Sequence, residues 1–239
     1  MAGCASKGLT AQGRALYPSE VLETRQVTDA DGTAFDVLAY ILEAAGKADM
    51  YVYGILDLRV DEEDGWDPTV PADAQAIHAL TAEAGARYAF DGWLLEGYSY
   101  PYRAQGDEET YAASGAGRTM EEFMEDAVAA AVRDAVETLR AADLNFYIGL
   151  LAGPVWAHQR VDSRGSETDS LYEEYTDGHA DTLGWLDEEL FDFVLVRDNR
   201  PIGHATSSFE TVLSWWSGVC YGAQFLASAF GGEVQPAPS

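Results

Sequence analysis

FDGWLLE, at residues 90–96, is an almost unbroken apolar run, and such a run is typical of a β-strand that is covered on both faces. Three further runs share this character: MYVYGILDLR at residues 50–59, NFYIGLL at 145–151 and LFDFVLV at 190–196. The intervals between them carry no hairpin signal. We therefore expect the four runs to be adjacent parallel strands of one sheet.

Helical patterns fill the intervals, and two of them begin at a capping box, formed by Thr119 with Glu122 and by Ser207 with Glu210. Apolar residues at helical spacing predict helices at residues 35–45, 71–88, 119–139, 178–188 and from 207 through 216. Strands that alternate with helices in this way predict an α/β protein with a parallel sheet. A last strand is predicted at 224–230, and residues 97–118 are predicted to form a long loop, of the kind that often carries function.

The charge balance is strongly acidic, with 14 Lys and Arg against 41 Asp and Glu and a net charge of −27. Such a chain repels phosphate backbones and anionic lipid, so we expect no nucleic-acid partner and a neutral or cationic ligand instead. The sequence contains no run of about 18 apolar residues, so no transmembrane segment is predicted.

The two cysteines, Cys4 and Cys220, make neither a disulfide framework nor a metal motif, and no cofactor is predicted. Cys4 stands in AGCAS, which is similar to the end of a bacterial lipoprotein leader, although no apolar run precedes it. We therefore expect an extracytoplasmic protein, secreted or lipid-anchored, with a cytoplasmic location as the alternative. The oligomeric state is left open.

FDGWLLEGYSYPYR, at residues 90–103, resembles the strand-four signature of the glycosyl hydrolase-like family ten, which has Asp-Gly, an apolar stretch, two acidic residues and Tyr-x-Tyr-Pro. Three further stretches agree with the family in their order: LYPSE with FDVLAYILEAAGKADMYVYGILDLR (16–20 and 35–59), GSETDSLYEEYTDGHADTLGWLDEELFDF (165–193) and VLSWW (212–216). The resemblance extends over residues 14–225.

The resemblance implies a (β/α)8 barrel of the TIM type that cleaves or binds a polysaccharide, for example an amino-sugar glycan of the cell envelope. A full barrel typically needs about 250 residues, so we expect a barrel that is incomplete at both ends. The expected domain limits are an N-terminal segment at 1–13, a single barrel-like domain at 14–230 and a flexible tail at 231–239.

The chain departs from the family at three strand ends. The acidic pair after strand four is Glu96 followed by Gly97, so one carboxylate of the pair is absent. LAGP at 151–154 stands where the family has a Ser-Pro-Phe-Gly type of loop, and VRDN at 196–199 stands where it has Pro-Gln-x-Tyr. These departures bear on catalysis more than on the fold.

Glycoside hydrolysis uses two carboxyl groups, about 5 Å apart in retaining enzymes and about 6.5–9.5 Å apart in inverting ones. In a barrel the functional groups lie where the strands end, which gives Glu96 as one catalytic residue and Asp57, Asp61 or Asp198 as its partner. Glu96 ends an apolar strand, and apolar surroundings favour the protonated carboxyl that a general acid needs. The alternative for Glu96 is an ion pair with Arg59 or Arg103. For the other acids it is a solvated surface position.

Aromatic and polar side chains near the same strand ends are the predicted substrate contacts, because sugar rings stack on flat apolar faces. These residues are Tyr98, Tyr100, Tyr102, Trp156, Arg59, Arg197 and His204. The alternative for the rings is packing within their loops, and for the arginines it is a salt bridge in an acidic chain. Asp91 lies at the start of its strand, so for it we expect a turn or a buried hydrogen bond and no chemistry.

Three functions stay open at this point. The first is a glycoside hydrolase that acts on a polysaccharide by a two-carboxylate mechanism. The second is a catalytically inactive carbohydrate-binding relative. The third is a fragment without a function of its own, because an open barrel leaves the edges of its sheet unpaired.

Overall fold

The structure is a computed structural model of the chain, and it describes residues 10–11, 14–15, 17–22, 27–33, 35–58, 67–100, 104–198, 200–220 and 224–228. The chain divides into two compact units, Met1–Gly149 and Leu150–Ser239. The boundary falls inside strand β5 (Tyr147–Ala152), so the strand order is β3-β4-β5 in the first unit and β5-β6-β7 in the second. That residues 14–230 form a single barrel-like domain stays a prediction.

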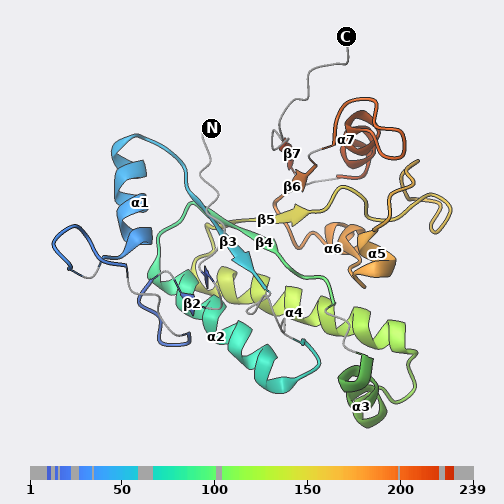
Figure 1. Cartoon of the computed structure of the whole chain (residues 1–239), viewed down its shortest axis with the longest axis horizontal. Coiled ribbons are helices and arrows are strands. Elements are labelled where there is room, and N and C mark those ends of the chain that lie inside the picture. The colour runs from blue at the N-terminus through green and yellow to red at the C-terminus, as the bar shows by residue number, and fades with distance from the viewer. Residues whose placement is uncertain are drawn as a thin grey trace. The chain divides into compact units, whose positions relative to one another are not determined.

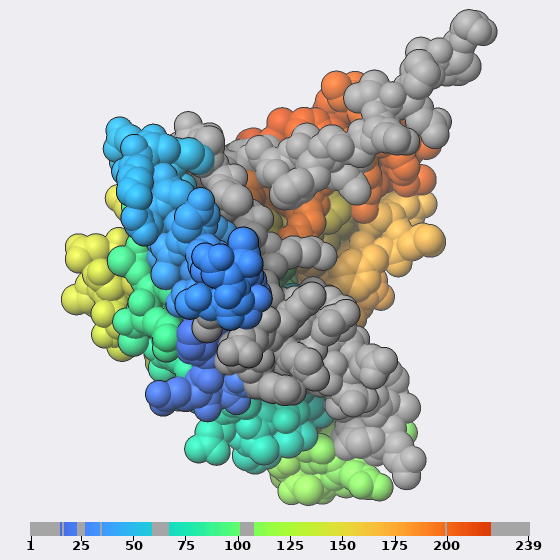
Figure 2. Space-filling model, turned by 60° about the vertical axis from the view of Figure 1, so that its left-hand side comes forward, coloured from blue at the N-terminus to red at the C-terminus, as the bar shows by residue number. Residues whose placement is uncertain are grey.

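The first unit is built around two parallel strands, with a long helical pair beside them (Figure 1). Its main elements are α1 (Val37–Lys47), β3 (Tyr53–Asp57), α2 (Pro71–Arg87), β4 (Gly92–Glu96), α3 (Ala104–Ser114) and α4 (Met120–Ala142). Helices α2 and α4 pack closely because Gly85 has no side chain: a Cβ there would stand 3.3 Å from Leu139. Helix α1 lies at the surface of the unit (Figure 2), and its one buried residue is Leu38.

Side chains alternate along β3 and β4, so this strand pair has two different faces. On one face the ring of Trp93 fills the space over Gly54, where a Cβ would lie only 2.6 Å from it. The other face carries the apolar Leu94 and, at the last position of each strand, Asp57 and Glu96. Because the ring of Trp93 packs tightly over Gly54, the two strands pair in only one register. This register places Asp57 and Glu96 on the same face of the sheet.

In its described residues, the second unit contains the end of β5, a second parallel strand pair and the helices named next (Figure 1). The elements are α5 (Glu174–Asp177), α6 (Thr182–Asp187), β6 (Phe193–Arg197), α7 (Phe209–Val219) and β7 (Gln224–Ser228). β6 and β7 are parallel, with Phe193 opposite Gln224. A cluster of apolar side chains joins the loop after β5 to α6 and α7; it consists of Trp156, Ala157, Leu183, Tyr175, Trp215 and Val219.

The four predicted strands are confirmed, and each begins two or three residues later than the apolar run did. The capping box of α4 is also confirmed, because Glu122 N donates to the Thr119 hydroxyl at 3.1 Å and Thr119 N donates to the Glu122 carboxylate at 2.8 Å. Asp91 makes the structural hydrogen bond expected of it, accepting from Val52 N at 2.7 Å. The described residues therefore form an α/β protein with parallel strands, while closure into a barrel stays a prediction.

Two local predictions were wrong. Residues 97–118 are not one long loop, because α3 occupies Ala104–Ser114; its sequence, AQGDEETYAAS, lacks the apolar stripe by which a helix is recognised. The N-cap of α7 is Ser208, which accepts from Thr211 N at 3.2 Å, and not Ser207. Either serine can cap a helix, so the sequence does not distinguish them. The structure also has a two-residue antiparallel pair, β1 (Thr10–Ala11) with β2 (Arg14–Ala15).

Candidate functional site

Two carboxylates stand side by side at the ends of the strands of the first unit. Asp57 is the last residue of β3, Glu96 is the last residue of β4, and the two are register partners in the parallel pair. Partners in a parallel pair point to the same face, so both side chains leave the same side of the sheet. Glu96 is buried at 5% exposure and Asp57 is half-buried. The structure thus brings together two of the four acids that the sequence singled out.

The chain turns sharply directly after Glu96, at the position where the resembled family has its second acid. Gly97 has a backbone φ of +71°, in the left-handed region that favours glycine. The backbone conformation therefore explains why no acidic residue stands at this position, because an acidic side chain here would be strained. Tyr98 and Tyr100 follow the turn, and both are buried, at 3% and 5% exposure.

Four residues named from the sequence lie outside the described residues. Arg59, Asp61 and Tyr102 are predicted site residues, and Arg103 is the second arginine named as an ion-pair partner of Glu96. The N-terminal Cys4, on which the prediction of a lipid anchor rests, lies outside them as well.

In the second unit a buried carboxylate binds the backbone directly after the end of β5. Glu174, the first residue of α5, is 5% exposed and accepts the N–H of Gly153 at 2.7 Å through Oε1. Thr182 donates to the other oxygen at 3.3 Å. The contact depends on a glycine, because a Cβ at Gly153 would lie 2.8 Å from Oε1. Glu174 therefore fixes the point at which the chain leaves the sheet.

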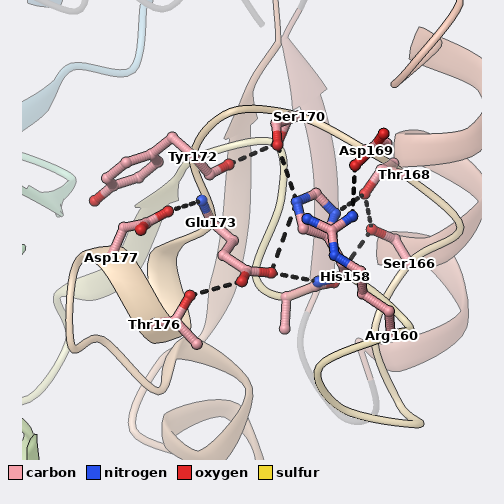
Figure 3. A network of polar contacts seen from close by, with 11 residues as sticks. His158, Arg160, Ser166, Thr168, Asp169, Ser170, Tyr172, Glu173, Thr176 and Asp177 are labelled. Atoms are coloured by element: carbon pink, nitrogen blue, oxygen red, sulfur yellow. Dashed lines mark hydrogen bonds and ion pairs between the residues drawn. The ribbon is translucent and has the colours of Figure 1, made fainter.

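A buried histidine network braces the loop that follows this point (Figure 3). His158 contacts the Thr168 hydroxyl through Nδ1 at 3.0 Å and the Ser170 carbonyl through Nε2 at 3.1 Å, and its backbone N donates to Glu173 at 2.6 Å. A carbonyl oxygen can only accept, so Nε2 carries the hydrogen in the contact with Ser170. Thr176 donates to the second oxygen of Glu173 at 2.6 Å. The network is satisfied within the protein, which indicates a structural role.

The remaining predicted residues of the second unit follow β6. Arg197 is its last residue and is half-buried, and Asp198 comes next, at 2% exposure. Oδ1 of Asp198 accepts the N–H of Arg200 at 3.0 Å, whereas Oδ2 has no hydrogen-bond partner among the described residues. His204 is exposed, with the Thr206 hydroxyl 3.5 Å from its Nδ1.

Trp156, predicted as a sugar-stacking platform, is instead a core residue with 0% exposure. Trp215 stacks against it with 6.0 Å between ring centres and an angle of 11° between the ring planes. The ring of Tyr175 packs at 5.1 Å, and the Arg164 guanidinium lies 5.1 Å from the Trp156 ring centre. These neighbours cover the ring, so it offers no open face.

Sequence reasoning passed over the buried carboxylates Glu173 and Glu174. They stand in LYEEYTD, and nothing local distinguishes them among 41 acids. The one available signal is their position between Tyr172 and Tyr175, and that pattern is weak because Tyr172 is exposed. What buries these acids is contact with residues about 20 positions earlier, such as Gly153.

Within the described ranges, no group of three or more His, Cys, Asp or Glu side chains is placed to hold a metal ion. In the same part of the chain, no helix combines the length and apolarity that crossing a bilayer requires.

An α/β chain with parallel strands, and with carboxylates at the ends of two neighbouring strands, has the features of the catalytic domains of glycoside hydrolases. The comparisons with known proteins agree with this class, although no family model matches the chain. "Glycosyl hydrolase YngK" of Bacillus subtilis is 26% identical over 158 residues, which are 64% of this chain and 31% of YngK. "Glycosyl hydrolase DigH" of Escherichia coli K12 is 24% identical over 157 residues, 64% of this chain and 36% of DigH.

The chain thus spans about a third of the length of these curated relatives. Among solved structures, the PgaB (BpsB) glycoside hydrolase domain from Bordetella bronchiseptica has a similar fold. Its TM-score is 0.53 at 14% identity, over 87% of this chain and 67% of that domain. The chain is therefore glycosidase-like in sequence and in fold. Membership of family ten in particular stays a prediction.

Proposed function

We propose that this chain is the catalytic part of a glycoside hydrolase that acts on a polysaccharide through Glu96 and Asp57. The observation that carries the proposal is their register: they end two neighbouring parallel strands and face the same side of the sheet. Sequence reasoning also considered Asp198 as the partner of Glu96. The shared strand pair favours Asp57, because adjacent strands fix its distance from Glu96.

The spacing supports a retaining mechanism. Neighbouring strands lie about 4.8 Å apart, so the two acids start from backbone positions separated by about that distance. Retaining glycosidases hold their carboxyl groups about 5–5.5 Å apart, whereas inverting enzymes need about 6.5–9.5 Å to admit a water molecule. Glu96, the more buried of the two, is the proposed acid and then base. Asp57 is the proposed nucleophile, which forms the glycosyl-enzyme intermediate that water later hydrolyses.

The charge of the chain limits the substrate class. A net charge of −27 disfavours anionic polysaccharides and accommodates neutral or cationic ones, which include amino-sugar glycans. An envelope glycan of this kind would place the protein outside the cytoplasm, and we include that location in the proposal. Tyr98 and Tyr100, buried directly after Glu96, are proposed to line the wall of the site.

The test is release of reducing ends from a panel of neutral, cationic and anionic polysaccharides by the full chain. Glu96→Gln and Asp57→Asn should each lower the rate by about 10²–10⁴-fold, because each removes a proton donor or a nucleophile without changing shape. Glu137→Gln, at an exposed position of α4, is the matched control and should keep the wild-type rate. Retention of anomeric configuration in the first product, followed by NMR, tests the assigned roles. Inversion would contradict them.

A catalytically inactive, carbohydrate-binding relative is the second candidate. The observation in its favour is Gly97, whose left-handed backbone stands where the resembled family has an acid. Binding of a polysaccharide without release of reducing ends would decide for this candidate. Wild-type activity in Glu96→Gln would remove Glu96 from any mechanism.

A further inference from the structure

The amino ends of three neighbouring strands in the first unit carry a group of tyrosines. Tyr53 is the first residue of β3, Gly92 is the first residue of β4 and Tyr147 is the first residue of β5. These strands are neighbours in the order β3-β4-β5, and Tyr53 is the register partner of Gly92. Tyr51 stands just before β3. The starts of the strands therefore bring together residues that are far apart in the chain.

A glycine makes the close approach of these residues possible. A Cβ at Gly92 would lie 2.7 Å from the Tyr53 ring and would also collide with the carbonyl oxygen of Tyr147. The Tyr53 ring therefore lies over the start of β4, beside the start of β5. Burial, followed by the neighbouring Asp91, Tyr147 and Tyr51, raises the pKa of the Tyr53 hydroxyl above its ordinary value of 10.0. Tyr51, Tyr53 and Tyr147 thus form one cluster, here called the tyrosine platform.

The platform is open to solvent, and its size favours a small ligand. Tyr51 is 61% exposed, Tyr147 is 60% exposed and Tyr53 is half-buried. An aromatic side chain has a surface of about 150–250 Å², so the two exposed residues present about 200–300 Å² together. A stable protein–protein interface covers about 800 Å² on each partner. The platform is therefore too small for a folded protein partner by itself.

The chemistry of the platform fits a sugar. A tyrosine combines a flat apolar face with a polar hydroxyl at its edge, and a sugar ring likewise has an apolar C–H face and hydroxyl groups at its edge. The charged neighbour of Tyr53 is the carboxylate Asp91, whose Oδ2 accepts from Val52 N at 2.7 Å. With a net charge of −27 in addition, an anionic ligand is disfavoured, whereas a neutral or cationic sugar is accommodated.

The platform and the two carboxylates lie at opposite ends of the same strand pair. Tyr53 is on the same face as Asp57 and Glu96, but four residues earlier in β3, which corresponds to about 13 Å. Ile55 and Leu94 lie between the two places on this face, and each is only 4% exposed. The platform is therefore a separate place on the surface of the first unit.

We infer that the tyrosine platform is a second polysaccharide-binding site, which holds a neutral or amino-sugar chain by stacking on Tyr51 and Tyr147. The inference rests on the proposed function for the class of ligand and adds a site that takes no part in the chemistry. A long chain that contacts the protein at two places is held more tightly than at either place alone. A short oligosaccharide reaches only one of them, so the platform should affect polymers and not short substrates.

The test measures polymer binding by the retardation of the full chain in gels that contain glucomannan, glycol chitosan or alginate, which are neutral, cationic and anionic. High salt in the gel screens the non-specific attraction of an acidic protein to the cationic polymer. Tyr51→Ala and Tyr147→Ala should each weaken binding to the neutral or cationic polymer by about 3–10-fold, and the double variant by about 10–100-fold. In initial rates, KM should rise for the polymer and stay unchanged for the matching tetrasaccharide.

Three controls separate a loss of stacking from a loss of folding. Tyr40→Ala makes the same change at another exposed tyrosine, in the first turn of α1, and should bind like wild type. Tyr51→Trp keeps a flat ring and should restore the binding that Tyr51→Ala loses. The melting temperature of Tyr51→Ala should lie within about 2 °C of wild type, because the side chain is exposed. If Tyr147→Ala does not fold, the Tyr51 variants decide.

The outcomes separate the platform from the proposed function. Polymer binding at wild-type strength in Tyr51→Ala refutes the platform and leaves the hydrolase proposal standing. An equal rise of KM for polymer and tetrasaccharide shows a single site and also refutes it. Retardation that Tyr51→Ala weakens, without release of reducing ends by wild type, supports the platform and removes only the hydrolase proposal.

Two further results would overturn the inference. Wild-type protein that neither the neutral nor the cationic polymer retards has no such site. A wild-type protein that elutes as two copies in size-exclusion chromatography, and as one copy when Tyr51 and Tyr147 are both alanine, uses the platform as a contact between copies of the chain.

Discussion

Gly153→Ala should destabilise the protein, although alanine usually stabilises a chain when it replaces glycine. A Cβ at position 153 would lie 2.8 Å from Oε1 and 3.2 Å from Cδ of Glu174, so the buried carboxylate must move away. The movement breaks the hydrogen bond from Gly153 N, which is 2.7 Å long. A hydrogen bond to a charged group contributes about 1.5–3 kcal/mol, and the lower entropy of the unfolded alanine chain returns about 0.4–1 kcal/mol. We expect a net loss of about 1–2 kcal/mol.

Gly218→Ala is the matched control, because it makes the same chemical change within the same unit. A Cβ at position 218 would meet nothing within 4 Å, and the residue lies in α7. There the substitution should stabilise the protein by about 0.5–1 kcal/mol. Urea unfolding followed by circular dichroism measures both changes. A Gly153→Ala variant as stable as Gly218→Ala would refute the reasoning. A double variant with Glu174→Ala should lose less than the sum of its single losses, because both substitutions remove the same contact.

Three further predictions concern the first unit. Thr119→Ala removes the capping box of α4 and should lower the free energy of unfolding by about 1 kcal/mol in urea titrations. Leu139→Ala opens a cavity at a fully buried position of the same helix and should cost about 2–5 kcal/mol, whereas Leu144→Ala, at 83% exposure, should change stability by less than about 0.5 kcal/mol. Burial and the hydrogen bond to Glu83 raise the pKa of Tyr17 above its ordinary value of 10.0, so the folded state holds this proton more tightly than the unfolded state. The free energy of unfolding should therefore fall as the pH rises above about 10, and Tyr17→Phe should weaken this dependence in urea titrations across that range.

Local sequence patterns determined most elements of this protein, and those elements were predictable for that reason. Apolar runs gave β3, β4, β5 and β6, because a strand covered on both faces needs apolar side chains on both. The capping box gave α4, because the bonds between Thr119 and Glu122 are made within one turn. Helix α3 was missed because its sequence carries no apolar stripe.

Some residues of the candidate site were likewise predictable from the local sequence, and others were not. The sequence alone singled out Glu96, since it ends an apolar strand, and Asp57 and Asp198 for the same reason. It could not choose among the candidate partners of Glu96, because the pairing register of two strands depends on how the ring of Trp93 packs over Gly54, 39 positions away in the chain. Trp156 was assigned wrongly because an aromatic residue in a loop has the same local sequence whether it is open or covered. Only the tertiary structure shows that Trp215 and Tyr175 pack against the Trp156 ring and cover it.

The sequence by itself therefore determined the α/β class, the positions of β3 to β6 and of most helices, and the acidic character on which the proposed ligand class rests. These properties follow from composition and from periodicities of two and about 3.6 residues, which are local. The tertiary structure decided which carboxylates stand side by side on one face of the sheet, which acids are buried as structural anchors, and that Oδ2 of Asp198 lacks a hydrogen-bond partner among the described residues. Burial and pairing arise from contacts between residues far apart in the chain, and among 41 acids no local signal ranks them.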